Sequence, residues 1–285
     1  MQQIKDIPKL PPRPLIGHKG DFGKICIIAG SVGFSGAAAI AGTSALRAGA
    51  GLVRVATPMS ILPIVATLQP CFTTIALVES EGKISKKAID VVLKAAEEND
   101  VLAFGPGVGI GPGPKVVLEN LLKTENLRLI IDADGLNNLA KLPDWPSFCK
   151  ANLILTPHPG EMKRIWTGLL REPLPQDRKT QTLEFAAATS ATVVLKGHQT
   201  VVADSKKFYI NTTGNPGMAT AGAGDVLTGI ISALCGQGLN NFDAAVLGVY
   251  VHGSAGDLAT EKLGQTSLMA TDIMDDLPQA FKNLI

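Results

Sequence analysis

An aspartate stands at the end of a run of small residues in the C-terminal third of the chain. Residues 214–229 read GNPGMATAGAGDVLTG, and Asp225 is the one charged residue among them. Because an apolar stretch follows, we expect a helix to begin near Asp225, with the N–H groups before it free to meet a ligand. Bare backbone and the helix dipole both favour phosphate oxygens, so the sequence predicts an anion hole formed by Ala221, Gly222, Ala223 and Gly224.

A carboxylate beside a phosphate-binding backbone suits a general base. Such a base takes a proton from a hydroxyl group as that hydroxyl attacks phosphorus. The segment is not a Walker loop, because no G-K-[ST] follows the glycines. The alternative is a helix cap, worth about 1 kcal/mol, but a cap needs no glycine-rich cradle in front of it. We therefore predict that Asp225 is catalytic.

Two glycine-rich segments follow expected strands and could bring bare backbone against a ligand. AGSVGFSGAA spans residues 29–38, and GPGVGIGPGP spans residues 105–114. The first has a G-x-x-G-x-x-G spacing with no acidic residue about 20 positions further on, so it does not match the dinucleotide-binding fingerprint. Either segment could be only a tight turn. Their place at the carboxyl ends of parallel strands favours a ligand wall.

Two aspartates follow another expected strand in DADGLNNL, residues 132–139. On an extended backbone Asp132 and Asp134 point to the same side, where they could hold Mg²⁺ through water or bond ribose hydroxyls. For Asp134 the alternative is the cap of a following helix, and the sequence leaves both interpretations open.

Two more motifs place polar side chains at strand ends. In LTPHPGEMKR, residues 155–164, prolines on both sides restrict the backbone of His158, and we predict a binding role for this histidine. Glu161 could simply be a favourable charge in the first turn of a helix. Lys196 and Gly197 stand where a strand meets a hairpin, and we expect this turn to hold adenine, ribose or phosphate.

Short apolar runs alternate with helical stretches along most of the chain, which is typical of parallel α/β architecture. The continuous apolar character of the runs predicts strands buried on both faces. Residues 199–204 and 207–212 are close enough in sequence to pair as a hairpin. The expected strands are 24–30, 52–57, 101–105, 127–134, 152–157 and 192–197, and the expected helices are 36–49, 85–97, 114–123, 161–168, 176–190, 225–236, 242–262 and 271–283.

Composition argues against several classes of protein. The chain has 285 residues, 46% of them hydrophobic, and a net charge of +1, so we expect neither a nucleic acid nor a membrane surface as partner. The N-terminus lacks the apolar segment of a signal peptide. The four cysteines show no metal-binding spacing, and we expect reduced, buried core residues in a cytoplasmic protein. We predict a single domain over residues 1–285, in which residues 1–20 form an extended proline-rich arm.

These motifs together resemble one enzyme family. GAGD at the start of a helix is similar to the anion-hole motif of the ribokinase-like superfamily. HKGDFGKICIIAGSVGFSGAAAIAG, LTPHPGE, LKGHQT and GNPGMATAGAGDVLTG resemble the ADP-dependent NAD(P)H-hydrate dehydratases, and the similarity runs from about His18 to Asp272. The resemblance implies a three-layer αβα sandwich with a central, mostly parallel sheet, and a homotetramer.

The resemblance also implies a metabolite-repair reaction. The S epimer of hydrated NADH or NADPH would lose water while ADP is converted to AMP and phosphate. Asp225 would activate the C6 hydroxyl of the hydrate, and Mg²⁺ would bridge the phosphates. The positions that match hydrate contacts are Ala37, Gly107, His158 and Asp225, and those that match AMP contacts are Lys196, Gly197, His198, Gln199, Thr200 and Gly224.

The chain departs from its family in two ways. Many relatives carry an epimerase domain in front of the dehydratase, so we expect a separate epimerase to act in the same pathway. Gly135 stands where the family often has alanine, a small change.

Two other functions compete with the dehydratase. A kinase of the same superfamily, acting on a vitamin precursor, would use the same cradle and base but accumulate a phosphorylated product. A nucleotide sensor would bind without turnover. Asp225 argues against the sensor, because a pure binder gains little from a carboxylate beside phosphate.

Overall fold

The structure, a computed structural model, describes residues 1–284 and is built around one large sheet. The strands of this sheet are β1 (Gln2–Gln3), β2 (Lys24–Ile28), β3 (Leu52–Pro58), β4 (Thr73–Leu77), β7 (Val101–Phe104), β8 (Arg128–Ile131), β9 (Asn152–Leu155), β10 (Thr192–Leu195), β11 (Val201–Ala203) and β12 (Lys207–Ile210). A separate antiparallel hairpin is formed by β5 (Glu79–Ser80) and β6 (Lys83–Ile84).

The sheet is mostly parallel, as the sequence predicts. Its order is β1-β12-β11-β10-β9-β8-β7-β2-β3-β4. All strands from β10 to β4 in this order run parallel to their neighbours. The pairs β10–β11 and β11–β12 are antiparallel, which confirms the expected hairpin. The carboxyl ends of the parallel strands therefore meet at one edge, where ligands bind in open α/β sheets.

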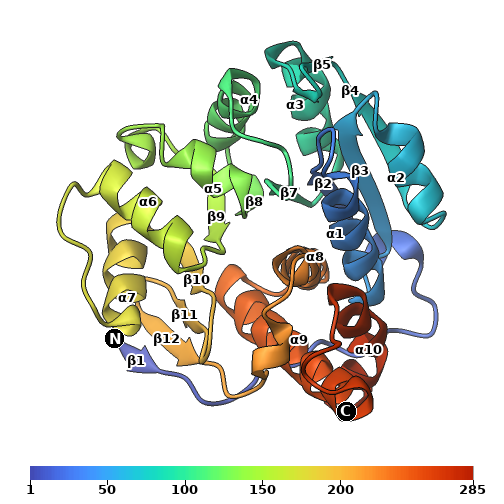
Figure 1. Cartoon of the computed structure of the whole chain (residues 1–285), viewed down its shortest axis with the longest axis vertical. Helices are drawn as coiled ribbons and strands as arrows, with labels where there is room; N and C mark the ends of the chain where they lie inside the picture. Colours follow the sequence, from blue (N-terminus) through green and yellow to red (C-terminus); the bar gives the residue numbers. More distant parts are fainter. Residues whose placement is uncertain (285) are drawn as a thin grey trace.

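Helices cover both faces of the sheet and complete a three-layer sandwich (Figure 1). On one face lie α1 (Ser35–Arg47), α8 (Ala223–Gly236), α9 (Asn241–Leu263) and α10 (Ala270–Lys282). On the other lie α3 (Ile89–Glu98), α4 (Pro112–Leu122), α5 (Asp134–Leu139), α6 (Pro159–Leu169) and α7 (Arg178–Thr189), while α2 (Leu62–Leu68) packs beside α1 and β4. The expected fold class is confirmed.

Two hydrophobic cores explain why the strand sequences are continuously apolar. Side chains of a strand alternate between faces, so Ile25 and Ile27 of β2 enter the core beneath α1 and α8. Cys26 and Ile28 of the same strand enter the opposite core. Burial on both faces leaves no room for a polar position.

Some elements differ from expectation. We predicted no element over β4, α2, β5 or β6. β4, for example, is an edge strand that begins with two threonines and has only Leu77 fully buried, so it lacks the apolar signal. The strand expected over 127–134 ends at Ile131, and Ala133 adopts a φ of +50°.

The expectation for the cysteines was only partly right. Cys26 and Cys235 are buried, but Cys71 is exposed and Cys149 is partly buried; all four are free thiols.

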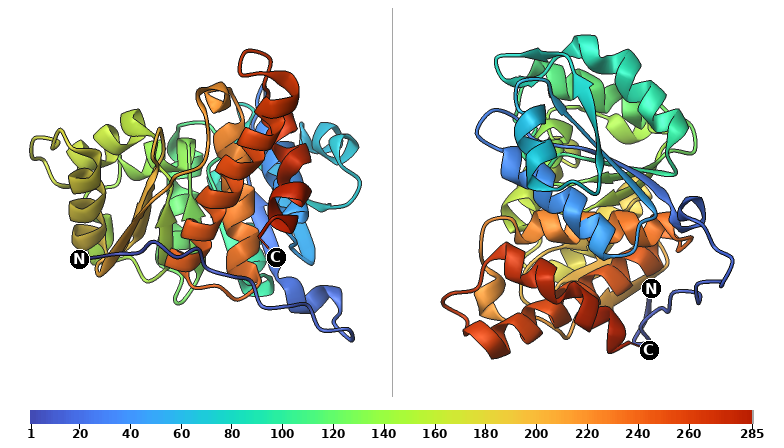
Figure 2. Two further views of the ribbon diagram at one scale, coloured as in Figure 1. Left: turned by 90° about the horizontal axis from the view of Figure 1, so that it is seen from below. Right: turned by 90° about the vertical axis from the view of Figure 1, so that its right-hand side faces the viewer.

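The N-terminal segment crosses the molecule before the first central strand. β1 pairs with β12, and the chain then runs along one side of the molecule (Figure 2). Arg13 holds this segment through hydrogen bonds from Nη2 to the Gly49 carbonyl (2.5 Å) and the Gln237 side chain (3.3 Å). Within residues 1–284, no helix combines the length and apolar character needed to cross a membrane.

Candidate active site

The helix start predicted near Asp225 is present. α8 begins at Ala223, and Gly222 before it has a φ of +90°, a conformation that a side chain would strain. No side chain caps this helix end. The Ala223 N–H donates to the Thr220 carbonyl (3.4 Å), which leaves the N–H groups of Gly224 and Asp225 to meet a ligand. Asp225 lies in this first turn and is mostly buried. The structure thus places Ala221 to Gly224 around one helix N-terminus.

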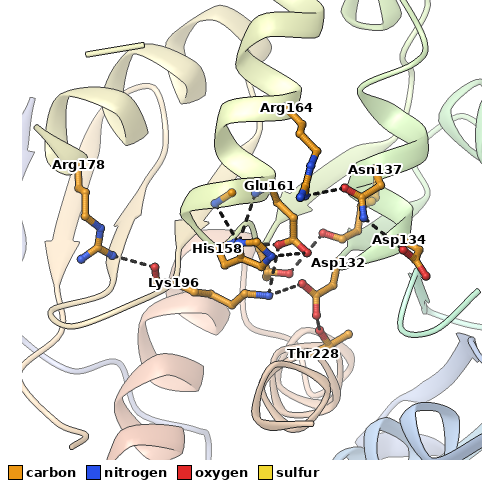
Figure 3. A network of polar contacts seen from close by, with 12 residues as sticks. Asp132, Asp134, Asn137, His158, Glu161, Arg164, Arg178, Lys196 and Thr228 are labelled. Atoms are coloured by element: carbon orange, nitrogen blue, oxygen red, sulfur yellow. Dashed lines mark hydrogen bonds and ion pairs between the residues drawn. The ribbon is translucent and has the colours of Figure 1, made fainter. Parts of the chain in front are cut away.

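A buried cluster of charged side chains adjoins this helix start (Figure 3). Lys196 Nζ lies 2.6 Å from Asp132 Oδ1 and 3.8 Å from Glu161 Oε2. Thr228 of α8 donates a hydrogen bond of 2.8 Å to the second oxygen of Asp132. A Cβ added to Gly224 would lie 3.2 Å from Lys196 Nζ, so the bare backbone of the anion hole faces the ammonium group directly.

Three adjacent parallel strands supply this cluster. Asp132 directly follows β8, Lys196 directly follows β10, and Glu161 lies in the first turn of α6, which follows β9. These strands are neighbours in the order β10-β9-β8, so their carboxyl ends bring the three side chains to one place. α8 then packs across the sheet and adds Asp225 and Thr228.

Charge around Lys196 holds it in the ammonium form. Burial works against that charge, but the carboxylates of Asp132 and Glu161 outweigh it and raise the pKa of Lys196. The pKa of Glu161 is raised by burial, although Lys196 opposes the shift. Carboxylates outnumber cations here, so the site favours an arriving cation or a retained proton.

Asp225 has the perturbed acidity expected of a proton acceptor. Burial, together with the carboxylates of Asp132, Glu161 and Asp134, raises the pKa of Asp225 to about 7, and Lys196 opposes the rise. A carboxyl group with a pKa near the working pH can both accept and release a proton, which is the property that general base catalysis requires.

His158 has a structural role that its surroundings define. It is the N-cap of α6, and its Nδ1 accepts hydrogen bonds from the N–H groups of Gly160 (2.9 Å) and Glu161 (3.4 Å). The carboxylate of Glu161 in return accepts a hydrogen bond from the backbone N–H of His158 (2.8 Å). Burial and the nearby Lys196 lower the pKa of His158, so the ring is neutral. Its side chain is 50% exposed and still open to a ligand.

Arg178 clamps the turn that follows β10. Its Nη2 donates to the carbonyls of Leu195 (2.8 Å) and Lys196 (3.0 Å), and its Nη1 donates to the carbonyl of His198. Gly197 and Gln199 both have positive φ, which glycine adopts freely but which strains the backbone at Gln199. The Arg178 guanidinium helps to hold the turn in this conformation. The predicted nucleotide contacts Gly197, His198 and Gln199 are exposed, and Thr200 closes the turn by donating to the Gly197 carbonyl (2.9 Å).

The two glycine-rich segments meet each other. Ser31 Oγ donates a 2.7 Å hydrogen bond to the Gly107 carbonyl, and a Cβ on Gly107 would lie 3.2 Å from that of Ala37. Ala37 and Gly107, the two predicted hydrate contacts in these segments, are therefore neighbours.

The two aspartates of DADG do not act as a pair, which corrects the expectation that they point to one side. The positive φ of Ala133 turns the chain between them. Asp132 bonds Lys196, whereas Asp134 starts α5 and accepts from the backbone N–H of Gly109 at 3.0 Å.

Sequence reasoning missed two features of this site. The ion pair of Lys196 with Asp132 was not expected, although both residues stand at strand ends. Arg178 was missed entirely. Its position beside Asp177, a helix cap, offers no signal of the turn it holds.

Comparison with known proteins agrees with the geometry. A family model described as NAD(P)H-hydrate dehydratase matches residues 25–279. An ADP-dependent (S)-NAD(P)H-hydrate dehydratase from Neisseria meningitidis serogroup B is 37% identical over 264 residues, covering 90% of this chain and 84% of the relative. A bifunctional NAD(P)H-hydrate repair enzyme, Nnr, from Moorella thermoacetica is 44% identical over 278 residues, covering 97% of this chain and 52% of the relative. The chain thus spans about half the length of such bifunctional relatives.

Solved structures support the same assignment. The ADP/ATP-dependent NAD(P)H-hydrate dehydratase from Bacillus subtilis, co-crystallised with ATP and Mg²⁺, matches with a TM-score of 0.83 at 30% identity, covering 97% of this chain and 95% of that one. Ribokinase from Thermotoga maritima, at 14% identity, matches with a TM-score of 0.58 over 92% of this chain and 100% of its own, and shows the fold alone. Because the family match covers nearly the whole chain and the architecture agrees, this chain belongs to the NAD(P)H-hydrate dehydratase family.

Proposed function

We propose that this enzyme dehydrates the S epimer of hydrated NADH or NADPH and converts ADP to AMP and phosphate. The observation that carries the proposal is Asp225, a carboxyl group with a pKa near 7 in the first turn of α8, directly behind the bare backbone of residues 221–224. Family membership and the 37% identical ADP-dependent relative support the choice of substrates.

Asp225 acts first, as the proton acceptor. It takes the proton from the C6 hydroxyl of the hydrate as that oxygen attacks the β-phosphorus of ADP, and AMP leaves. The backbone N–H groups of Ala221 to Gly224 and the ammonium group of Lys196 stabilise the charge that develops on the phosphoryl oxygens. Phosphate then departs from C6 with loss of a proton from C5, which restores the dihydropyridine ring.

We assign the remaining contacts on the basis of position. Ala37, Gly107 and His158 contact the hydrate, and the exposed turn from Lys196 to Thr200, together with Gly224, holds the adenosine side of ADP. Lys196 joins this turn to the charged cluster at the start of α8, because its side chain reaches Asp132 while its carbonyl belongs to the turn clamped by Arg178.

Magnesium fits this site as a partner of the phosphates. Among residues 1–284, no group of three or more His, Cys, Asp or Glu is arranged to hold a metal ion on its own. The excess of carboxylates around Lys196 nevertheless favours a cation. Mg²⁺ keeps several waters and is commonly bound mainly through substrate phosphates, so it needs few protein ligands. Both oxygens of Asp132 are already bonded, to Lys196 and to Thr228, so we expect the phosphates of ADP to supply most of the contacts of the bound ion. When bound, it would neutralise phosphate charge.

The wider setting of the protein is also proposed. We place residues 1–285 in one catalytic domain and the enzyme in the cytoplasm, as a homotetramer, with an NAD(P)H-hydrate epimerase acting in the same pathway. Leu15 and Ile16, which are fully exposed in the N-terminal segment, are apolar positions that a subunit contact would cover.

A single assay tests the proposed function. The enzyme is incubated with the S hydrate, ADP and Mg²⁺, and the return of dihydronicotinamide absorbance is followed together with AMP and phosphate. A dehydratase restores the absorbance and forms AMP and phosphate in equal amounts. A kinase of the same fold would leave the absorbance flat and accumulate a phosphorylated product, and a sensor would produce neither.

A further inference from the structure

An aromatic side chain is exposed at the start of α1. Phe34 is the N-cap of this helix and makes no cap hydrogen bond, although the position normally holds Ser, Thr, Asp or Asn. Its side chain is 57% exposed to solvent. Phe34 therefore stabilises neither the helix end nor a hydrophobic core to the extent that its type allows, and its ring is open to another partner.

The loop that carries Phe34 is held in one conformation. The Phe34 N–H donates to the Ser31 carbonyl (2.8 Å), and the Ser31 hydroxyl donates to the Gly107 carbonyl (2.7 Å). A Cβ on Gly107 would lie 2.8 Å from the Cβ of Phe34 and 3.2 Å from that of Ala37. The aromatic ring thus adjoins the bare backbone that we assign to the hydrate.

Two more exposed apolar side chains lie on the same two loops, Val32 on the loop of Phe34 and Ile110 on the loop of Gly107. Val32 is 60% exposed and Ile110 is 39% exposed. The β5–β6 hairpin supports both, because Gly82 accepts the Val32 N–H (2.9 Å) and Lys83 Nζ donates to the Ile110 carbonyl (3.2 Å). Three loops therefore present an apolar rim around exposed backbone, next to a candidate active site.

Phe34 lies apart from the reacting end of the substrate. The start of α8 meets α1 at Ile40, whose Cδ1 would be 3.0 Å from a Cβ on Gly222. Ile40 follows Phe34 by six positions on α1, which corresponds to about 9 Å along a helix axis. A substrate ring that reacts at Asp225 and a substrate ring that contacts Phe34 would therefore be two different rings. A dinucleotide contains two such rings, the nicotinamide and the adenine.

We propose that Phe34, with Val32 and Ile110 exposed on the adjoining loops, is the platform on which the adenine ring of the dinucleotide hydrate stacks. The inference rests on the proposed function. Adenine is flat and aromatic, and stacks well on an aromatic side chain. The hydrated nicotinamide ring is saturated at C5 and C6 and is therefore a poorer stacking partner. Such a platform would favour a dinucleotide over its mononucleotide half.

The test compares two substrates in Phe34→Ala, Phe34→Ser and Phe34→Tyr. One substrate is NADH hydrate, and the other is the hydrate of reduced nicotinamide mononucleotide, which lacks the adenosine. For Phe34→Ala and Phe34→Ser we expect kcat/KM for NADH hydrate to fall about 10- to 100-fold, the range that loss of base stacking produces. We expect kcat/KM for the mononucleotide hydrate and KM for ADP to stay within a few-fold of wild type. Phe34→Tyr retains the preference for the dinucleotide.

Stability separates this role from a structural one. Serine is a favoured N-cap, so Phe34→Ser keeps or raises the melting temperature while it weakens dinucleotide use. Leu68→Ala, at another exposed apolar position (56% exposed, in α2), serves as a control and leaves both substrates unaffected.

Several outcomes would overturn the proposal. Equal losses on both hydrates would place Phe34 at the reacting ring, and a raised KM for ADP would place it at the wrong nucleotide. Unchanged kinetics in Phe34→Ala would remove the platform but leave the proposed function intact. A wild-type enzyme that restores neither hydrate would refute both.

Discussion

At the scale of single residues, the pKa of Asp225 depends on the groups that surround it. A carboxyl group in the first turn of a helix normally has a low pKa, because the helix dipole stabilises its charge. Here burial and the carboxylates of Asp132 and Glu161 are stronger than that effect and raise the pKa to about 7. The same environment that prepares Asp225 to accept a proton therefore makes its ionised form unfavourable in the folded protein.

Replacing Asp225 by asparagine should separate catalysis from stability. Asparagine has nearly the size and polarity of aspartate, and Asp225 does not cap α8, so a merely structural role predicts unchanged activity. A general base predicts that kcat falls by roughly 10²- to 10⁴-fold. ADP affinity should persist or increase, because one negative charge near the phosphates is gone. Retention of kcat within a few-fold of wild type would refute the catalytic assignment.

The stability of Asp225→Asn should depend on pH. The pKa of Asp225 rises from its usual 3.8 to about 7 on folding, so the native state retains a proton that the unfolded chain releases in this range. As pH rises from about 4 to 7, the free energy of unfolding of the wild-type protein therefore falls relative to that of the Asp225→Asn variant. At pH 8 the variant should be the more stable protein, with an upper limit of about 4 kcal/mol that residual solvent exposure reduces. Urea unfolding at pH 5 and pH 8 measures the difference in unfolding free energy between the variant and the wild type. An advantage of the variant that is larger at pH 5 than at pH 8 would contradict the raised pKa.

Lys196 controls the acidity of its neighbours. Lys196→Met removes the charge that lowers the pKa values of Asp225 and Glu161, so the acidic limb of the pH profile of kcat/KM should move to higher pH. It also leaves Asp132, which is 1% exposed, without its cation, and losing one member of a buried pair costs about 3–5 kcal/mol. Lys206→Met, at an exposed lysine of the hairpin turn, is the control. An unchanged pH profile in a folded Lys196→Met protein would be evidence against the coupling.

At the scale of secondary-structure elements, the carboxyl ends of the strands position the residues of the site. β8, β9 and β10 end at one edge of the sheet, and the turn after β10 has no regular structure of its own to hold it there. Arg178, at the start of α7, supplies that support by donating to three carbonyls of the turn. Because the carbonyls point toward Arg178, neighbouring backbone N–H groups can face the nucleotide.

Arg178→Lys should weaken nucleotide binding in particular. Lysine keeps the charge but lacks the planar fork that reaches several acceptors at once. We expect KM for ADP to rise by about tenfold, equivalent to about 1.4 kcal/mol, while KM for the hydrate changes little. Arg171→Lys, at an exposed arginine outside the site, provides the matched control. Equal effects on both substrates would indicate general destabilisation of the fold.

At the scale of the whole molecule, close packing against α1 fixes the position of α8. A Cβ on Gly229 would lie 2.3 Å from the Ala41 carbonyl oxygen and 2.8 Å from Ser44 Cβ, so only glycine allows the two helices to approach this closely. α8 carries Asp225 at its start and Thr228 one turn later. The contact between the helices therefore positions Asp225 as well as filling the core.

Gly229→Ala should destabilise the protein by about 1–3 kcal/mol, the usual cost of overpacking. Gly36→Ala is the comparison, because a Cβ there meets nothing within 4 Å and the backbone is helical. For that variant we expect a gain of about 0.4–1 kcal/mol from the less flexible unfolded chain. Thermal unfolding of both variants provides the measurement. Equal stability of the two would show that α1 and α8 can move apart freely.

Local patterns in the sequence were sufficient to determine much of this protein. Continuous apolar runs determine the central strands, because residues buried on both faces must all be apolar, and the small residues before Asp225 determine an open helix start. Edge strand β4 escaped prediction because part of it faces solvent.

The contacts between residues of the candidate site depend on the order of the strands in the sheet. Lys196 and Asp132 are 64 positions apart in the chain, and nothing near either residue indicates the other. Only the adjacency of β8, β9 and β10 brings them to 2.6 Å, and only the turn at Ala133 sends Asp134 elsewhere. The types of the reacting groups follow from the sequence, whereas their charge states arise from burial and from neighbours that the tertiary structure supplies.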